Sequence, residues 1–379
     1  MTQNGHRISG NQSMNFNYNT MEPIIAPVSV DILKAELTPA KKLRDTNKSH
    51  NEIYVITHHD SPNVMREIGR LREEAFRDSG GGTGLSMDID EFDTMENPYH
   101  QLIVWDPDAE KILGGYRFIY GNDIQIDENG QPMLATAHMF HFSKKFMKEY
   151  LPYTIELGRS FVAPEYQSSK AGAKALFALD NLWDGLGALG IIRPDMKYFF
   201  GKMTMYPDYN REARDLIQHF LFKHFKDEEK LVTPIEPLKI ETPAEYMDSI
   251  LTEDEFKADY KILNAEVRSR GVNIPPLVNS YMNLSPTMKM FGGGINHEFG
   301  EVEETCILIN YDEISENKRE RHINSFIKEK IANIKSRFPK WAEEMGDNLS
   351  NMLSSRRAKR QEAIDKRKTK RKNRKSKKS

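Results

Sequence analysis

Two charged residues interrupt the apolar segment YTIELGRSFVAP, residues 153–164, whose composition is that of a β-strand. Glu156 and Arg159 are three positions apart, so on a regular strand their side chains point to opposite faces of the sheet. One of them then faces the layer that covers the sheet, where a charge needs a partner or a ligand because unpaired burial is costly. We expect either a structural ion pair, with Arg117 as a candidate partner, or a catalytic role.

A polar turn follows this strand and leads into the helical pattern of residues 166–190. The turn fits a Q-x-x-G-x-G loop with lysine in place of the first glycine. Such a loop presents backbone N–H groups at a helix N-terminus, where the partial positive charge favours a phosphate, and the lysine would add a full charge. Ordinary helix capping is the alternative explanation. The residues of this candidate phosphate site are Gln167, Ser168, Ser169, Lys170, Ala171 and Gly172.

An acidic cluster precedes another strand pattern. Asp88, Asp90, Asp93 and Glu96 lie within nine positions. Carboxylates this close together can bind a cation or an amine, and the pKa of one of them can be raised by the others. A solvated acidic loop is the alternative explanation for the same pattern.

The elements that must position these residues alternate along the chain. A strand pattern, a polar turn and a helix pattern recur in that order, which is typical of a mixed α/β sheet with helices on its faces. The strand patterns are residues 52–60, 100–107, 111–121, 153–164 and 196–207, and the helix patterns are residues 61–82, 166–190, 210–227 and 240–270.

The composition suits a globular protein with polar extensions. A chain of 379 residues has room for a large buried core. We expect residues 1–50, which are polar and rich in Asn, to be mostly disordered, and residues 51–316 to form one domain. Residues 317–379 are charged and helix-prone, so we expect a helical extension that ends in a basic tail.

Several classes of protein are disfavoured. No stretch approaches the length of a membrane-spanning helix and the N-terminus lacks the apolar core of a secretory signal, so we expect a cytoplasmic protein. A single cysteine, Cys306, excludes a disulfide framework, and its apolar surroundings favour a core residue over a nucleophile. His138 and His141 have no nearby third ligand, so we expect no metal site.

The order of these pieces resembles the amino-acid N-acyltransferases that make ornithine and glycine lipids, in the hemolysin-like branch of the GNAT superfamily. The family pattern is an R-x-x-x-F helix, an acidic F-D, a G-x-Y/x-R strand and an E-L-G-R-S strand. A further block, I-P-P-L-x-x-x-Y, is similar to residues 274–281, and the similarity covers roughly residues 52–315. Acyl-homoserine-lactone synthases share the first half of the pattern. The matching positions are Arg72 and Phe76, Phe92 and Asp93, residues 115–117, and residues 156–160.

The resemblance implies a GNAT-like fold and an enzyme without a tightly bound cofactor. The reaction that it implies moves a fatty acyl group, typically 3-hydroxylated, from acyl carrier protein or CoA to the amino group of glycine or ornithine. Such a reaction needs no covalent intermediate with the enzyme. By resemblance, the catalytic residues are Glu156, Arg159 and Asp93, the substrate-binding residues are Arg72, Asp90, Arg117 and Ser160, and the backbone at Phe161 and Val162 binds the thioester arm.

The basic tail widens the range of partners. From residue 356 to residue 379, fourteen Lys or Arg stand against Glu362 and Asp365, a net +12 in a chain whose total is -2. Such a tail is attracted to an anionic membrane, which would place the enzyme peripherally on the inner face of the cytoplasmic membrane, or nonspecifically to nucleic acid. Two other functions stay open: a GNAT that acetylates a small amine or peptide from acyl-CoA, and a degenerate GNAT core whose tail binds nucleic acid.

Overall fold

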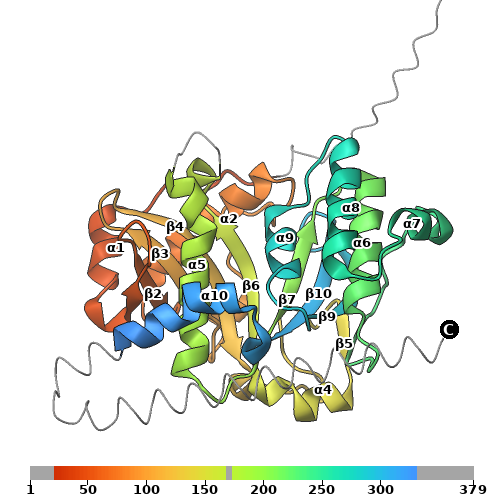
Figure 1. Ribbon diagram of the computed structural model, residues 1–379. Helices are drawn as coiled ribbons and strands as arrows, with labels where there is room; N and C mark the ends of the chain where they lie inside the picture. The colour runs from red at the N-terminus through yellow and green to blue at the C-terminus, as the bar shows by residue number, and fades with distance from the viewer. Residues whose placement is uncertain (1–20, 168–172, 331–379) are drawn as a thin grey trace, which may run out of the picture.

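An eight-stranded sheet forms the centre of the computed structural model, which describes residues 21–167 and 173–330 (Figure 1). The strand order is β1-β2-β3-β4-β6-β7-β10-β9, and neighbouring strands are antiparallel except β6 and β7, which are parallel. This arrangement confirms the α/β class expected from the sequence. The strands are β1 (Lys42–Asp45), β2 (Glu52–Ile56), β3 (His100–Asp106), β4 (Lys111–Tyr120), β6 (Thr154–Val162), β7 (Tyr198–Met205), β9 (Lys289–Asn296) and β10 (Val302–Asn310).

Helices cover both faces of the sheet, with α5 across the front in Figure 1. Arg72 of α2 bonds to Gln101 of β3, whereas Gly185 of α5 packs closely on the next residue, Leu102. Successive strand residues point to opposite faces, so α2 and α5 lie on opposite sides of the sheet. The helices are α1 (Val30–Glu36), α2 (Pro62–Asp78), α3 (Glu91–Thr94), α4 (Lys144–Glu149), α5 (Ala173–Ile192), α6 (Arg211–Phe225), α7 (Ala244–Ile250), α8 (Phe256–Ser269), α9 (Pro276–Met282) and α10 (Glu316–Arg319).

The N-terminus of α2 is capped from another helix. Pro62 occupies the first turn, where its missing N–H costs nothing, and Ser61 precedes it without making a side-chain cap. The carboxylate of Glu36, in α1, accepts the backbone N–H groups of Asn63 and Val64 instead. This contact fixes α1 against α2, and therefore fixes residues ahead of position 51 to the domain.

The two ends of the described chain pack on the sheet and on α5. Within residues 21–50, part of the segment that we expected to be mostly disordered, α1 and β1 are formed and β1 is the edge strand beside β2. At the other end, His322 lies in a π-helical turn and its Nδ1 is 2.7 Å from Oδ1 of Asp184 in α5. The helical path then continues to residue 330. The basic tail lies outside the described residues.

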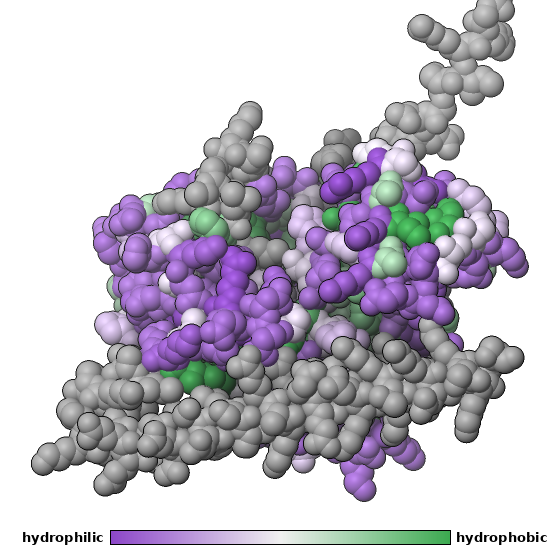
Figure 2. All heavy atoms as spheres, in the orientation of Figure 1, coloured by the Kyte–Doolittle hydropathy of each residue, from purple (hydrophilic) through white to green (hydrophobic). Residues whose placement is uncertain are grey.

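A second, smaller core lies beside the main one. It is covered by α4 and by a two-stranded sheet of β5 (Phe140–Phe142) and β8 (Val232–Pro234). Phe146 and Phe200 are fully buried there, and their ring centroids are 5.4 Å apart. The outer surface shown in Figure 2 is mostly hydrophilic, with a hydrophobic area over the region of α6, α7 and α8. Among the described helices, none is long and apolar enough to cross a membrane.

Candidate functional site

The sheet opens between its two parallel strands. The pairing of β6 with β7 runs from Thr154 opposite Tyr198 to Leu157 opposite Gly201 and then stops, although β6 continues to residue 162 and β7 to residue 205. The two strands therefore diverge in the middle of the sheet. Backbone groups that would otherwise bond across this gap are available to a ligand.

Glu156 lies at the start of this divergence, in the interior of the protein. Its side chain is 1% exposed, and it accepts a short hydrogen bond from the hydroxyl of Tyr99. The same hydroxyl accepts the backbone N–H of Ala135 at 3.1 Å. Burial raises the pKa of the Glu156 carboxyl above its usual range, although the hydrogen bond from Tyr99 and the charge of Arg117 oppose the rise. A raised pKa makes this carboxylate a stronger base than an exposed glutamate, which suits it to accept a proton from a bound substrate.

A buried ion pair joins α2 to α3 beneath the site. Nη1 of Arg72 lies 3.0 Å from Oδ2 of Asp93, and both side chains are fully buried. Gln101 completes the group, since its amide donates to Oδ1 of Asp93 at 2.9 Å and its oxygen accepts from Arg72. Burial acts to raise the pKa of Asp93, but the charges of Arg72 and Arg117 outweigh it and lower the pKa to about 2. Asp93 is therefore a permanent anion that holds arginines in place.

Arg117 links this ion pair to the acidic loop. Its Nη1 is 2.8 and 2.7 Å from the carboxylate oxygens of Asp90 and 3.4 Å from Oδ2 of Asp93. Asp90 also caps α3 by accepting the backbone N–H of Asp93. Burial acts to lower the pKa of Arg117, but the two aspartates outweigh it and raise the pKa. Its Nε is buried and has no hydrogen-bond partner within the described ranges, which leaves one donor for a ligand.

Arg159 interrupts the alternation of β6. Its φ is +47°, in the left-handed region, and the register between β4 and β6 shifts so that Arg159 and Ser160 together oppose Tyr116. This is a β-bulge, with one extra residue in β6. A side chain in this region costs about 1–2 kcal/mol relative to an extended conformation, and such strain is found mostly at functional sites.

The bulge corrects one prediction. We expected Glu156 and Arg159 on opposite faces, but the extra residue turns Arg159 to the side of Arg117, and the two arginines share Asp90 at 3.6 and 2.7 Å. Nε of Arg159 also lies 2.9 Å from Oδ2 of the buried Asp88. The structure thus brings the acidic loop and the E-x-x-R strand together on the face that holds Glu156.

A notch without a side chain lies among these groups. Gly158 follows Glu156 on the same face and is paired with Arg117. A Cβ built at Gly158 would be 3.5 Å from Nε and 3.7 Å from Cγ of Arg117, which is ordinary van der Waals contact. The sheet therefore has room here for a small group, directly beside the unpartnered Nε of Arg117.

A second buried ion pair, between Lys202 and Glu304, lies on the same face and was not predicted from the sequence. Nζ of Lys202 in β7 lies 2.5 Å from Oε2 of Glu304 in β10, and both side chains are largely buried. Asn296 donates to the same carboxylate oxygen at 2.9 Å. The sequence does contain an indication of this pair, because Lys202 follows Phe200 by two positions in a largely apolar strand pattern and therefore lies on the same covered face.

Other predicted residues lie elsewhere. Ser160 faces the hydroxyl of Tyr116, which is also 3.3 Å from the hydroxyl of Tyr281 in α9. Tyr116 alternates with Arg117 along β4, so this group is on the sheet face opposite Glu156. The remaining predicted positions are Phe161, which is buried, Val162, which is half-buried, Gln167, whose amide donates to the carbonyl of Val162 at 2.7 Å, and Ser168, Ser169, Lys170, Ala171 and Gly172, which lie outside the described residues.

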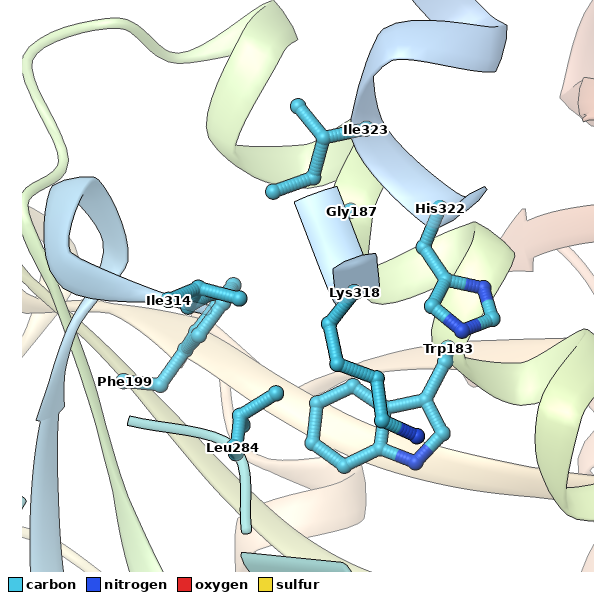
Figure 3. Close-up of a pocket in the computed structure, with 8 residues that line it drawn as sticks. All are labelled: Trp183, Gly187, Phe199, Leu284, Ile314, Lys318, His322 and Ile323. Atoms are coloured by element: carbon cyan, nitrogen blue, oxygen red, sulfur yellow. The ribbon is translucent and has the colours of Figure 1, made fainter. Parts of the chain in front are cut away.

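A small pocket also lies on that opposite face (Figure 3). Trp183 and Gly187 of α5, Phe199 of β7 and Lys318 of α10 are among its lining residues. Phe199 precedes Phe200, which is opposite Glu156, so the pocket and the carboxylate are separated by the sheet. The pocket therefore lies between α5 and the C-terminal helices and is not part of the polar site.

Comparisons with known proteins agree with this geometry. A family model described as an acetyltransferase (GNAT) domain matches residues 71–176. The chain is 68% identical over 309 residues to a glycine N(alpha)-acyltransferase of Phocaeicola vulgatus, which covers 82% of this chain and 95% of that protein. It is also 68% identical over 307 residues to a glycine N(alpha)-acyltransferase of Bacteroides thetaiotaomicron, which covers 81% of this chain and 91% of that protein.

One solved structure is also similar, a CoA-dependent acyl-homoserine lactone synthase, BjaI, with SAM and isopentyl-CoA. The match has 15% identity and a TM-score of 0.25, and covers 44% of this chain and 72% of that chain. A likeness of this size bears on neither the fold nor the reaction.

The matched domain and the buried carboxylate beside the diverging strands define a GNAT-superfamily acyltransferase. The identity to two named relatives over most of their length places the chain more narrowly: it belongs to the amino-acid N-acyltransferases of that superfamily. The expectation of a GNAT-superfamily amino-acid N-acyltransferase, drawn from the sequence motifs, is thereby confirmed.

Proposed function

We propose that this enzyme acylates the α-amino group of glycine with a fatty acyl group, typically 3-hydroxylated, carried as a thioester on acyl carrier protein, as the first step of aminolipid synthesis. The names of the two relatives favour glycine over ornithine. The observation that carries the proposal is Glu156, a buried carboxylate with a raised pKa where β6 and β7 separate. That arrangement suits proton removal from an amine next to a thioester.

Glu156 is the general base in this proposal. Its carboxylate takes one proton from the ammonium group of glycine, directly or through water, and the neutral amine then attacks the thioester carbonyl carbon. As the C–N bond forms, the C–S bond breaks, and the thiolate leaves with the second proton of the amine. Tyr99 keeps the carboxylate oriented through its hydrogen bond. Arg72, Asp90, Asp93 and Arg159 hold the surrounding loop and strand in position through their ion pairs.

The donor approaches from the other side of the sheet. In the proposal, the phosphate of the pantetheine arm binds at the turn that precedes α5, and the arm then passes between the diverging β6 and β7, where backbone N–H groups near Phe161 and Val162 bond to it. Because α5 and Glu156 are on opposite faces, donor and acceptor meet at the gap without sharing a path. The thioester is a co-substrate, and no bound cofactor takes part.

Purified enzyme with 3-hydroxyacyl carrier protein or the matching acyl-CoA, and with glycine or ornithine, tests the proposal. We expect N-acylglycine by mass spectrometry, with the carrier-protein thioester preferred. Glu156→Gln should lower kcat by about 100-fold or more, because an essential general base is lost. Glu165→Gln, which changes an exposed carboxylate paired with Lys111, is the matched control. Near-normal turnover of the Glu156 variant would remove this residue from the role of base.

The basic tail is proposed to bring the enzyme to its lipid product. Lys and Arg near an anionic surface contribute about 1 kcal/mol each, so a tail of net +12 needs only partial engagement. Truncation after Ser355 should abolish binding to vesicles that contain anionic lipid while leaving acylation of glycine in solution intact. Loss of nucleic-acid binding with unchanged vesicle binding would instead assign the tail to nucleic acid.

A further inference from the structure

The notch at Gly158 shares its face of the sheet with three charged residues on β4, β6 and β7. Glu156 precedes it on β6, and Arg117 is its partner on β4. The last pair between the parallel strands is Leu157 with Gly201, so Lys202 is level with Gly158 across the gap. Phe200, opposite Glu156, and Lys202 are two positions apart and therefore share its face of the sheet.

Lys202 keeps a donor for a ligand. An ammonium group carries three N–H donors. Its partners in the described ranges are Oε2 of Glu304 at 2.5 Å and the weak acceptor Sδ of Met139 at 3.7 Å. Glu304 is held independently by Asn296 at 2.9 Å, so it stays in place whether or not Lys202 also binds something else.

The arginines around the notch are committed to aspartates. Arg72 is fully buried against Asp93, and Nη1 of Arg117 donates to both carboxylate oxygens of Asp90. The buried Nε of Arg117 has no hydrogen-bond partner in the described chain, and that nitrogen borders Gly158. One N–H of Arg117 therefore borders the notch, and Lys202 is level with it on the neighbouring strand and the same face of the sheet.

We propose that Lys202 and the Nε–H of Arg117 bind the carboxylate of the acceptor amino acid over Gly158, which makes Lys202 a determinant of specificity for an α-amino acid over a neutral amine. This inference rests on the proposed function and assigns its acceptor site. The carboxylate fits because each of its oxygens accepts one charged N–H, and charge-assisted hydrogen bonds are the stronger ones. With the carboxylate held there, the amino group of a small amino acid lies toward Glu156, the neighbour of the notch on the same face.

The test compares glycine with glycinamide, which has the same amine but no carboxylate. For each acceptor, kcat and KM of Lys202→Met are divided by the wild-type values, so that the different basicities of the two amines cancel. We expect KM for glycine to rise about 10- to 100-fold, the effect of losing one hydrogen bond between charged groups, with glycinamide changed less than about threefold. Lys202→Arg, which keeps the charge, should recover most of the affinity for glycine.

Lys289→Met is the matched control, because Lys289 is also a partly buried lysine on the same sheet, 2.8 Å from the buried Asp227. It should leave the ratio between the two acceptors unchanged. If KM rises equally for glycine and glycinamide in Lys202→Met, or for neither, the inference is overturned. The proposed function, acylation of glycine, is not affected by either result. If Lys202→Met does not melt cooperatively, Lys202→Gln takes its place. Absence of glycine acylation by the wild-type enzyme would overturn the proposed function and the inference together.

Discussion

Replacing Asp93 by asparagine tests whether the buried ion pair beneath the site holds the domain together. Asp93 is fully buried and accepts from Arg72 at 3.0 Å, Arg117 at 3.4 Å and Gln101 at 2.9 Å. Asparagine has nearly the same shape but no charge, so it leaves Arg72 buried without its main counter-ion. Removing one member of a buried pair lowers the free energy of unfolding by about 3–5 kcal/mol.

The pH dependence of stability gives a second measure of the same pair. The pKa of Asp93 falls from the usual 3.8 to about 2 in the fold, so the folded state favours the carboxylate. The stabilisation is therefore complete above pH 4 and is lost as the pH falls toward 2. From the linkage between pKa and stability, the loss is about 2 kcal/mol. In Asp93→Asn this part of the pH dependence should be missing.

Urea unfolding followed by circular dichroism, at pH 7 and at several values below pH 5, measures both effects. Glu165→Gln is the control, because its partner Lys111 is exposed and such pairs contribute about 0–1 kcal/mol. A loss below about 1 kcal/mol in Asp93→Asn at pH 7, equal to that of the control, would refute the reasoning. If the stability of Asp93→Asn fell with pH below 5 as much as that of the wild type, the lowered pKa of Asp93 would be refuted.

Three further predictions concern the site and the divergence of the strands. Tyr99→Phe removes the hydrogen bond that favours the charged form of Glu156, so the pKa of Glu156 should rise further. The acid limb of the kcat profile should then move to higher pH, which the ratio of variant to wild-type rates across the pH range measures. Gly158→Ala should fold with a normal melting temperature, since its Cβ meets only ordinary contacts, yet raise KM for glycine by filling the notch; an unchanged KM would contradict this site. Gly201→Ala should instead lower the melting temperature, because its Cβ would lie 2.7 Å from the carbonyl oxygen of Leu157 and force the parallel strands apart where they are still paired; a stability equal to that of Gly158→Ala would be evidence against the close contact.

Local patterns in the sequence predicted much of the fold. The apolar alternation of residues 153–164 and the helical spacing from residue 61 both correspond to elements of the structure, β6 and α2. These predictions succeed because one face of each element is buried, and a buried face requires apolar residues at a regular spacing along the sequence. The cap of α2 was not predictable in the same way, since Glu36 reaches it from another helix.

The site was predictable only in part. The E-x-x-R strand and the acidic loop were identified, but their geometry depends on the left-handed conformation of Arg159. Arginine at that position does not indicate a left-handed conformation, whereas glycine would. The pairing of Lys202 with Glu304 joins strands 102 positions apart, and a single sequence carries no record of such contacts. A lone lysine within a covered strand is the kind of exception that can reveal a long-range partner.

The extra residue in β6 also has a meaning for anyone who would rebuild this enzyme. Deleting Ser160 would restore regular alternation in β6 and place Arg159 opposite Tyr116, so the guanidinium that now meets Asp88 would point to the other face of the sheet. A graft onto another scaffold must therefore copy the irregularity along with the side chains, because the motif letters alone do not encode which way the arginine turns.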